Sequence, residues 1–152
     1  MEKKPVARRS VTSENLGAWV IKCNPNKTPL APMVSAGEAK RTWCVAANYR
    51  SQLMQPGQHV LLWVSTHTRR GFWGAGTITG TVTSDGAGHR VPVHILLFAE
   101  PLTATTLSAL PGLRTMEVFR SPQQANPSWV STTEMRILER LLDNRGNTTP
   151  TR

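Results

Sequence analysis

The stretch GQHVLLWVSTHTRRGFWGAGTITG, residues Gly57–Gly80, decides the fold predicted for this chain. After a Pro-Gly turn it runs through VLLWVS, residues 60–65, which are nearly all apolar. A short apolar run bounded by turn residues predicts a strand buried on both faces. The polar, doubly basic loop 66–71 then leads into a second strand, in which Ile78 and Val82 alternate with threonines.

Three glycines lie along this second strand, at Gly74, Gly76 and Gly80. A glycine inside a strand usually marks a bulge, a sharp bend or the close approach of another backbone. Two long strands kinked by glycines predict a small curled sheet or barrel. The sequence therefore predicts an α+β domain built on a curved sheet, with short helices at its margins.

The remaining elements are read from local patterns. Further strands are expected at 18–23, at 91–98, where Val91, Val93, Ile95 and Leu97 share one face, and at 42–45 and 116–119. Helical segments are expected at 35–40, 48–54 and 103–110, while prolines keep the segment before residue 35 irregular. Residues 121–128 are expected to form a polar loop. The clearest helix follows Ser131, which forms a capping box with Glu134.

Size and charge limit the possible partners. A chain of 152 residues is large enough for one domain with its own core. The net charge is +9, and residues 1–50 hold nine Lys and Arg against three acids. A basic domain of this kind is attracted to phosphate backbones. Solubility and a solvated basic tail are the alternative explanation of the same charge.

The ends of the chain are expected to lie outside the domain. Residues 1–16 are predicted to be a flexible basic arm, 17–143 the domain, and 144–152 a flexible tail. The basic start has no apolar segment after it, which argues against a secretory signal. No apolar run approaches the roughly 18 residues of a membrane helix, so a cytoplasmic protein without a membrane partner is expected.

The polar residues give little support to catalysis. Two cysteines, Cys23 and Cys44, lack metal-ligand spacing and are expected to be reduced thiols. The four histidines are scattered, and no phosphate-binding loop or nucleophile motif is present. The sequence therefore predicts no enzyme, no cofactor and no bound metal. An enzyme would need His67 or His94 paired with Asp85 or Glu117.

Five tryptophans stand out against one tyrosine and three phenylalanines. Trp19 and Trp63 are expected to pack in the core. Trp43 and Trp129 lie beside polar loop residues, where an aromatic plane can stay partly open to a ligand. Stacking a base on such a plane contributes roughly 1–3 kcal/mol. The side chains best placed to read the edge of a flipped base are Asn24, Ser65 and Asn126.

Several of these segments together resemble EVE domains of the PUA-like superfamily. The resemblance covers about residues 17–142 and depends on the order and spacing of short motifs. These motifs are WVIKCNP at 19–25, Trp43 with Asn48-Tyr49, PGQHV at 56–60, WVS at 63–65, Gly71, GAGTI at 74–78, and the loop and capped helix at 120–142. Many EVE domains have Arg where this chain has Ala47, which removes one charged contact, and Asp where it has Gln58. The Gln58 departure is expected to affect only a turn.

The resemblance implies a PUA-like mixed pseudo-barrel that binds a modified base without chemistry. EVE domains resemble the YTH readers of N6-methyladenosine, and the comparison implies that Trp43 is an aromatic wall, that the backbone of Cys44 contacts the base and that Asn24 binds its edge. Other expected pocket residues are Val45, Asn48, Trp63, Ser65, Trp73, Phe119, Asn126 and Trp129. Phosphate contacts are expected from Lys40, Arg41, Arg50, Arg69 and Arg70.

The working hypothesis is therefore a non-catalytic reader of nucleic acid that carries a modified base, such as 5-methylcytosine. One alternative is general RNA binding through the basic surface, with the pocket residues merely packed in the core. Another is a protein that binds a nucleoside or another small molecule. The sequence leaves open which base is read, and whether the polymer is DNA or RNA.

Overall fold

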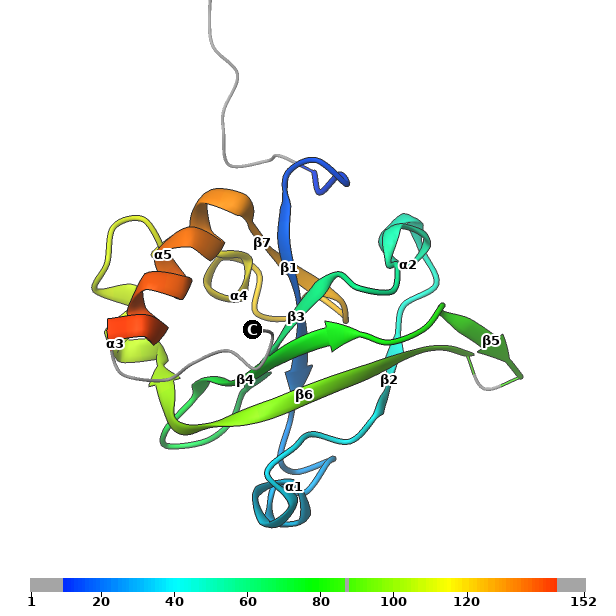
Figure 1. Cartoon of the computed structure of the whole chain (residues 1–152), viewed down its shortest axis with the longest axis horizontal. Helices are drawn as coiled ribbons and strands as arrows, with labels where there is room; N and C mark the ends of the chain where they lie inside the picture. The colour runs from blue at the N-terminus through cyan, green and yellow to red at the C-terminus, as the bar shows by residue number, and fades with distance from the viewer. Residues whose placement is uncertain (1–9, 87, 145–152) are drawn as a thin grey trace, which may run out of the picture.

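The structure of the protein is a computed structural model, which describes residues 10–86 and 88–144. Within these residues one sheet has the strand order β2-β6-β4-β3-β1-β7, with β5 paired to β6 (Figure 1). The strands are β1 (Leu16–Cys23), β2 (Thr42–Val45), β3 (His59–Val64), β4 (Gly71–Ile78), β5 (Thr83–Asp85), β6 (Gly88–Thr103) and β7 (Ser128–Ser131). The helices are α1 (Ala31–Ala36), α2 (Tyr49–Leu53), α3 (Ala104–Ser108), α4 (Glu117–Arg120) and α5 (Thr132–Asn144). The β1–β3 pair is parallel and the other pairs are antiparallel.

The central strand β3 is buried on both faces, as its apolar run predicts. Val60, Leu62 and Val64 face one core cluster, which we call the inner core. Leu61 and Trp63 face a second cluster on the opposite side of the sheet, the helix-side core. The alternation follows from the two-residue period of a strand, which sends successive side chains to opposite faces. The expected face of β6 is also confirmed, since Val91, Val93 and Ile95 are buried in the inner core and Leu97 packs against it.

Helices α3, α4 and α5 gather on one side of the curled sheet and cover the helix-side core (Figure 1). The predicted capping box opens α5: the Ser131 N–H donates to Glu134 Oε1 at 2.8 Å, and the Glu134 N–H donates to Ser131 Oγ at 3.1 Å. Met135, Leu138 and Leu142 then face the core at helical spacing. The helix therefore starts where its capping box predicts.

The glycines of β4 allow two backbones to approach closely, as expected. A β-carbon at Gly76 would lie 1.7 Å from the His94 carbonyl oxygen on β6. The strand differs from its prediction at its end. It stops at Ile78, and the threonine-rich continuation to Val82 lies outside it. The chain there leaves the sheet before β5 begins the hairpin with β6.

The sheet curls until its two ends are linked. Strands β2 and β7 stand at opposite ends of the strand order, yet the Ala46 N–H just after β2 donates to the Asn126 carbonyl, just before β7, at 2.7 Å. The fold is a mixed α+β arrangement with a curled, half-barrel sheet and a few short helices. This is compatible with the predicted pseudo-barrel.

Two predicted elements are wrong. The helix expected at 35–40 is α1, which begins earlier because Pro32 lies in its first turn, where proline costs no hydrogen bond. It ends at Gly37, whose φ of 76° forms the left-handed helix end. The strand expected at 116–119 is the one-turn helix α4, because a short apolar run does not distinguish a strand from a buried helical turn.

The predicted arm is shorter than residues 1–16. Val11 is buried in the inner core, the side chain of Asn15 accepts from the Thr12 N–H at 2.7 Å, and β1 starts at Leu16. Residues 1–9 and 145–152 of the two predicted tails lie outside the described residues. Of the helices in the described part of the chain, none has the length and apolar character needed to span a membrane.

Candidate functional site

A pocket of about 420 Å³ opens at the carboxyl ends of the parallel strands β1 and β3. The pairing of Cys23 with Val64 brings the two strand ends together, and the Ser65 N–H donates to the Cys23 carbonyl at 3.0 Å. The two loops that follow these strands and the loop after α4 supply the walls. The lining residues are Lys22, Asn24, Trp63, Ser65, Thr66, Arg70, Val118, Pro122, Gln124 and Asn126.

Five residues predicted separately from the sequence line this single pocket. They are Asn24, Trp63, Ser65, Asn126 and Arg70. Sequence reasoning missed Lys22, Thr66, Val118, Pro122 and Gln124. A signal for Lys22 was available, because it is a lysine within an otherwise apolar strand and stands two residues before Asn24.

Only a small part of the Trp63 ring is exposed in the pocket. This side chain is 3% exposed and packs edge-to-face against Phe72 and Phe119, with ring centroids 4.9 Å and 5.7 Å away. Phe119, one of the expected pocket residues, therefore contacts Trp63 within the helix-side core. Trp63 offers an apolar surface to a ligand rather than an open stacking face.

The prediction that Trp43 and Trp129 keep an open plane is wrong. Both are in the inner core, 4% and 5% exposed. The Trp43 Nε1–H donates to the Lys40 carbonyl at 2.9 Å, and Lys40 Nζ lies 4.7 Å from the centroid of the Trp43 ring. Trp129 belongs to β7 and stands opposite Trp19, because the polar loop ends one residue earlier than its composition suggests.

Other predicted base-pocket residues lie elsewhere. Val45 is buried in the inner core, while Cys44, its neighbour on β2, is exposed with Sγ 3.6 Å from an Arg90 nitrogen. Asn48 caps α2, where its side chain accepts from the Arg50 N–H at 3.0 Å. Trp73 donates from Nε1 to the Arg69 carbonyl at 2.9 Å, away from the lining of the pocket.

Both cysteines are free thiols, as expected. Burial raises the pKa of Cys23 to about 11, although the nearby Lys40 charge lowers it in part. Cys23 is therefore a packed thiol of the inner core rather than a nucleophile.

Four of the predicted phosphate contacts are placed outside the pocket lining. Arg41 pairs with Glu38 at 3.1 Å, and Arg69 pairs with Glu100 at 2.5 Å. Lys40 covers the ring of Trp43. Arg50 is the clearest correction, since its side chain is only 12% exposed and its guanidinium is used within the fold.

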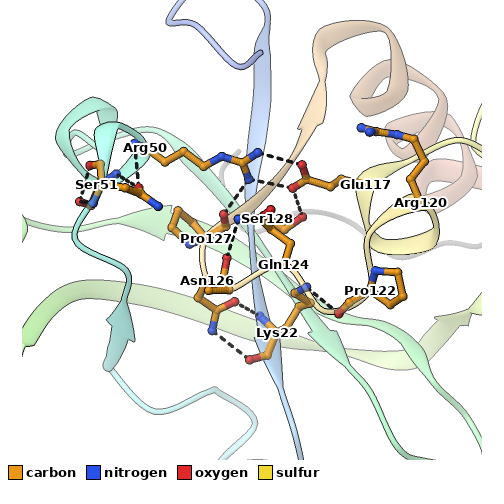
Figure 2. Close-up of polar contacts among 12 residues, drawn as sticks. Lys22, Arg50, Ser51, Glu117, Arg120, Pro122, Gln124, Asn126, Pro127 and Ser128 are labelled. Carbon is orange, nitrogen blue, oxygen red and sulfur yellow. Dashed lines mark hydrogen bonds and ion pairs between the residues drawn. The ribbon is translucent and has the colours of Figure 1, made fainter. Parts of the chain in front are cut away.

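Arg50 joins α2 to α4 and β7 in a buried network (Figure 2). Its two terminal nitrogens donate to the two Glu117 oxygens, each at 2.8 Å, and one of them also donates to the Pro127 carbonyl at 3.0 Å. The Ser128 hydroxyl adds a third bond to Glu117 at 2.6 Å. Burial alone would raise the pKa of Glu117, but the hydrogen bonds from Arg50 and Ser128 and the Arg50 charge hold that pKa below its usual range.

Asn126 extends the pairing of β1 beyond the end of β7. That ladder pairs Trp19 with Trp129 and Val20 with Ser128, so the same register sets Lys22 opposite Asn126. There the side chain replaces the backbone: Asn126 Oδ1 accepts from the Lys22 N–H at 2.8 Å, and Nδ2 donates to the Lys22 carbonyl at 3.1 Å (Figure 2). The Asn126 amide therefore builds the pocket wall, and it is less free to read a base than predicted.

Asn24, Ser65 and Lys22 are also held by hydrogen bonds to nearby groups. Asn24 Oδ1 accepts from the Asn26 N–H at 3.0 Å, and the Ser65 hydroxyl donates to the Cys23 carbonyl at 3.3 Å. Lys22 Nζ donates to the Pro122 carbonyl at 2.9 Å (Figure 2). Burial lowers the pKa of Lys22, and the Arg50 charge adds to this effect while Glu117 opposes it.

The pocket lining contains amides, two hydroxyls and two cations, but among the described residues no carboxylate or histidine. Two of the residues named for an enzyme have other partners, since His94 lies 3.2 Å from Glu38 and Glu117 binds Arg50. The described residues also contain no group of three or more His, Cys, Asp or Glu side chains that could hold a metal ion.

Comparison with known proteins identifies a shared fold. No family model and no curated protein matches the chain. A hypothetical protein from Leishmania major has a similar structure, with 18% identity, a TM-score of 0.70, and coverage of 89% of this chain and 99% of that chain. A Pseudomonas putida protein has 18% identity, a TM-score of 0.66 and coverage of 82% and 98%, respectively. A Rhodopseudomonas palustris protein has 17% identity, a TM-score of 0.63 and coverage of 80% and 90%. At these identities the likeness concerns the fold alone.

Proposed function

We propose that this chain is a PUA-like domain of the EVE type, which binds nucleic acid without catalysis and takes a single modified base into the pocket between β1 and β3. The order and spacing of the motifs from Trp19 to Leu142 support the family. A curled half-barrel sheet with short helices is compatible with it.

One observation carries the proposal. Residues chosen from distant parts of the sequence as candidate ligand contacts, from Asn24 to Asn126, line the same pocket. Its volume of about 420 Å³ lies within the roughly 300–1,000 Å³ of small-ligand sites. An apolar surface with a few convergent polar groups is the usual composition of such sites.

A base would be held mainly through its edge. Asn24 and Gln124 contribute amide groups, and Ser65 contributes a hydroxyl. Trp63 contributes an apolar surface, but its ring faces are covered by edge-on aromatic neighbours. A base inside a duplex would first have to leave the stack, at a cost of a few kcal/mol that is least for single strands. We therefore expect the protein to bind a modified base in a single strand more tightly than the same base in a duplex.

The backbone at Thr66 supports a ligand site. This pocket residue has a φ of 49°, in the left-handed region that β-branched side chains rarely adopt. Such conformations cost about 1–3 kcal/mol and cluster at ligand-binding sites. The loop that carries Thr66 also carries Arg70, so the unusual conformation sets the path of one pocket wall.

A second candidate is general RNA binding through the basic surface, without selection of a base. The burial of Trp43 and Trp129 favours it, because two expected walls of the aromatic cage are in the core. A third candidate, a protein that binds a nucleoside or another small molecule, would use the same pocket.

Fluorescence polarisation with matched DNA and RNA oligonucleotides tests the proposal. Each oligonucleotide carries cytosine, 5-methylcytosine, 5-hydroxymethylcytosine, adenine or N6-methyladenine at one position. We expect a preference of tenfold or more for one modification, which corresponds to about 1.4 kcal/mol. Equal, salt-sensitive binding to all would support the second candidate, and binding to none of them would contradict both.

Variants link any preference to the pocket. Asn24→Ala and Ser65→Ala should each reduce the preference, because they remove groups from the pocket lining. Ser35→Ala is the matched control, since Ser35 is exposed on α1. Trp43→Ala is a poor test, because it removes a core side chain and would destabilise the fold.

A further inference from the structure

We infer that the pocket binds its ligand through an anionic group held by Lys22 and Arg70, so that its ligand is a nucleotide bound with its own phosphate rather than a free base or nucleoside. The inference rests on the proposed function for the identity of the ligand, but its charge follows from the pocket itself. It makes Lys22, which sequence reasoning missed, a residue that determines specificity.

The charges that line the pocket have one sign. Lys22 and Arg70 are its charged lining residues in the described part of the chain, and no Asp or Glu accompanies them. A second hollow of about 360 Å³ between α2 and the β5–β6 hairpin provides a contrast. Its described lining contains no Lys, Arg, Asp or Glu and consists of Ser51, Gln52, Met54, Gln55, Pro56, Thr81, Val82 and His89. The positive charge is therefore a property of the pocket between β1 and β3 and not of every hollow on a basic protein.

Glu117 compensates this charge only in part. Glu117 is the carboxylate that acts on Lys22 electrostatically, but both of its oxygens are bound by Arg50 at 2.8 Å and one also by Ser128. Arg50 acts on Lys22 as well, with the opposite sign to Glu117. The effect of Glu117 on the pKa of Lys22 is larger than that of Arg50, so the pair compensates the Lys22 charge in part, but the effect of burial prevails.

The Lys22 ammonium forms no direct ion pair with a carboxylate in the described residues. Its side chain is half-buried, and its one hydrogen-bond partner in the described residues is the neutral Pro122 carbonyl at 2.9 Å. Removing a charge from water is costly unless an opposite charge compensates it. Burial accordingly lowers the pKa of Lys22. An anion in the pocket would pair with the ammonium directly and raise that pKa again.

The Arg70 guanidinium is free to bind a ligand, whereas that of Arg69 is not. The Arg69 guanidinium is paired with Glu100, whereas the Arg70 guanidinium has no partner among the described residues. The backbone of Arg70 is fixed, since its N–H donates to the His67 carbonyl at 3.1 Å. A guanidinium matches two phosphate oxygens at once, and a lysine ammonium adds a point charge. Both residues line the same pocket, and we expect them to bind the phosphate together.

Isothermal titration with mononucleotides tests the inference. The ligands are cytidine and adenosine 5′-monophosphates with and without base methylation, the matching nucleosides, and inorganic phosphate. We expect a monophosphate to bind at least tenfold more tightly than its nucleoside, and phosphate to compete with it. Lys22→Gln and Arg70→Gln should each remove most of this difference, and Lys22→Arg should retain part of it.

The controls separate pocket charge from overall charge. Lys27→Gln and Arg69→Gln remove the same charge from residues outside the pocket lining, and both should leave the difference unchanged. Urea unfolding of each variant verifies that the fold persists. In the unmodified protein, affinity for the monophosphate should also fall as the pH rises toward the pKa of the bound Lys22.

The outcomes distinguish this inference from the proposed function. Equal binding of nucleoside and monophosphate, or variants at Lys22 and Arg70 that bind normally, would overturn the inference and leave base recognition standing. Binding of monophosphate and phosphate that depends on both residues, without binding of any oligonucleotide, would support the anionic site and refute the nucleic-acid function. Failure to bind any of these anions would overturn the inference outright.

Discussion

Gly76 lies where β4 crosses the backbone of β6, and this position tolerates no side chain. A β-carbon there would lie 1.7 Å from the His94 carbonyl oxygen and 2.7 Å from the Ile95 α-carbon. Both neighbours are backbone atoms, so they can move only if the pairing of the two strands changes.

Gly76→Ala should therefore destabilise the protein by about 3 kcal/mol, at the upper end of typical overpacking costs. The free energy of unfolding in urea measures this. Gly86→Ala is the matched control, because a β-carbon at Gly86 meets no atom within 4 Å. Equal urea midpoints for the two variants would show that β4 and β6 do not approach as described.

The Gln58 side chain forms a long-range hydrogen bond in addition to its bond within the turn. The expectation that this position affects only a turn is incomplete. Gln58 Oε1 accepts from the indole N–H of Trp19 at 2.7 Å and from the Gln55 N–H at 2.7 Å. The glutamine thus satisfies a buried donor that lies 39 residues away in the sequence.

Among the elements, α2, α4 and β7 depend on one ion pair. The Arg50–Glu117 pair has side chains 12% and 6% exposed, and it also binds Pro127 and Ser128 at the start of β7. A buried pair contributes little compared with an apolar replacement, but removal of one partner leaves an uncompensated buried charge.

Arg50→Gln should consequently reduce the free energy of unfolding by about 3–5 kcal/mol. The pH dependence follows from the lowered pKa of Glu117 in the folded state. The stabilisation from this group is complete above the unfolded pKa of about 4.3 and is lost as the pH falls through the lower folded value.

Urea unfolding of the protein between neutral pH and pH 3 tests this dependence. Glu117→Gln should lower stability at neutral pH and weaken its loss in acid, whereas Glu139→Gln, on the exposed surface of α5, should change neither. An unchanged acid profile in Glu117→Gln would show that the pair does not form.

At the scale of the whole molecule, affinity and specificity should come from different parts of the chain. The net charge of +9 provides an attraction to any polyanion, while the pocket provides discrimination. Residues 1–9 lie outside the described fold and carry four Lys and Arg against one Glu.

Removal of residues 1–9 should weaken binding to every oligonucleotide and make its salt dependence shallower. The slope of log K against log salt is about −0.7 per phosphate contacted on a single strand. Polarisation titrations at several salt concentrations give this slope, and the ratio of affinities for modified and unmodified oligonucleotides should stay constant. A change in that ratio would place base recognition partly in the arm.

Local sequence was sufficient for the strands that have a clear period and for the helix that has a clear cap. The apolar run of β3, the alternating face of β6 and the capping box at Ser131 depend on neighbouring residues, so each could be predicted within a few positions. The grouping of Asn24, Ser65 and Trp63 also followed from short motifs at strand ends.

Pairing between residues far apart in the sequence determined the polar contacts of the pocket and the burial of Trp43 and Trp129. Lys22 meets Asn126 across 104 residues, and Arg50 meets Glu117 across 67. Trp43 and Trp129 are buried because of the registers of β2 and β7, which no neighbouring residue reveals. Composition and spacing specify which residues prefer a strand, a turn or a core. Which distant segment satisfies a buried polar group, and which cation is left without a partner, depends on how the curled sheet closes.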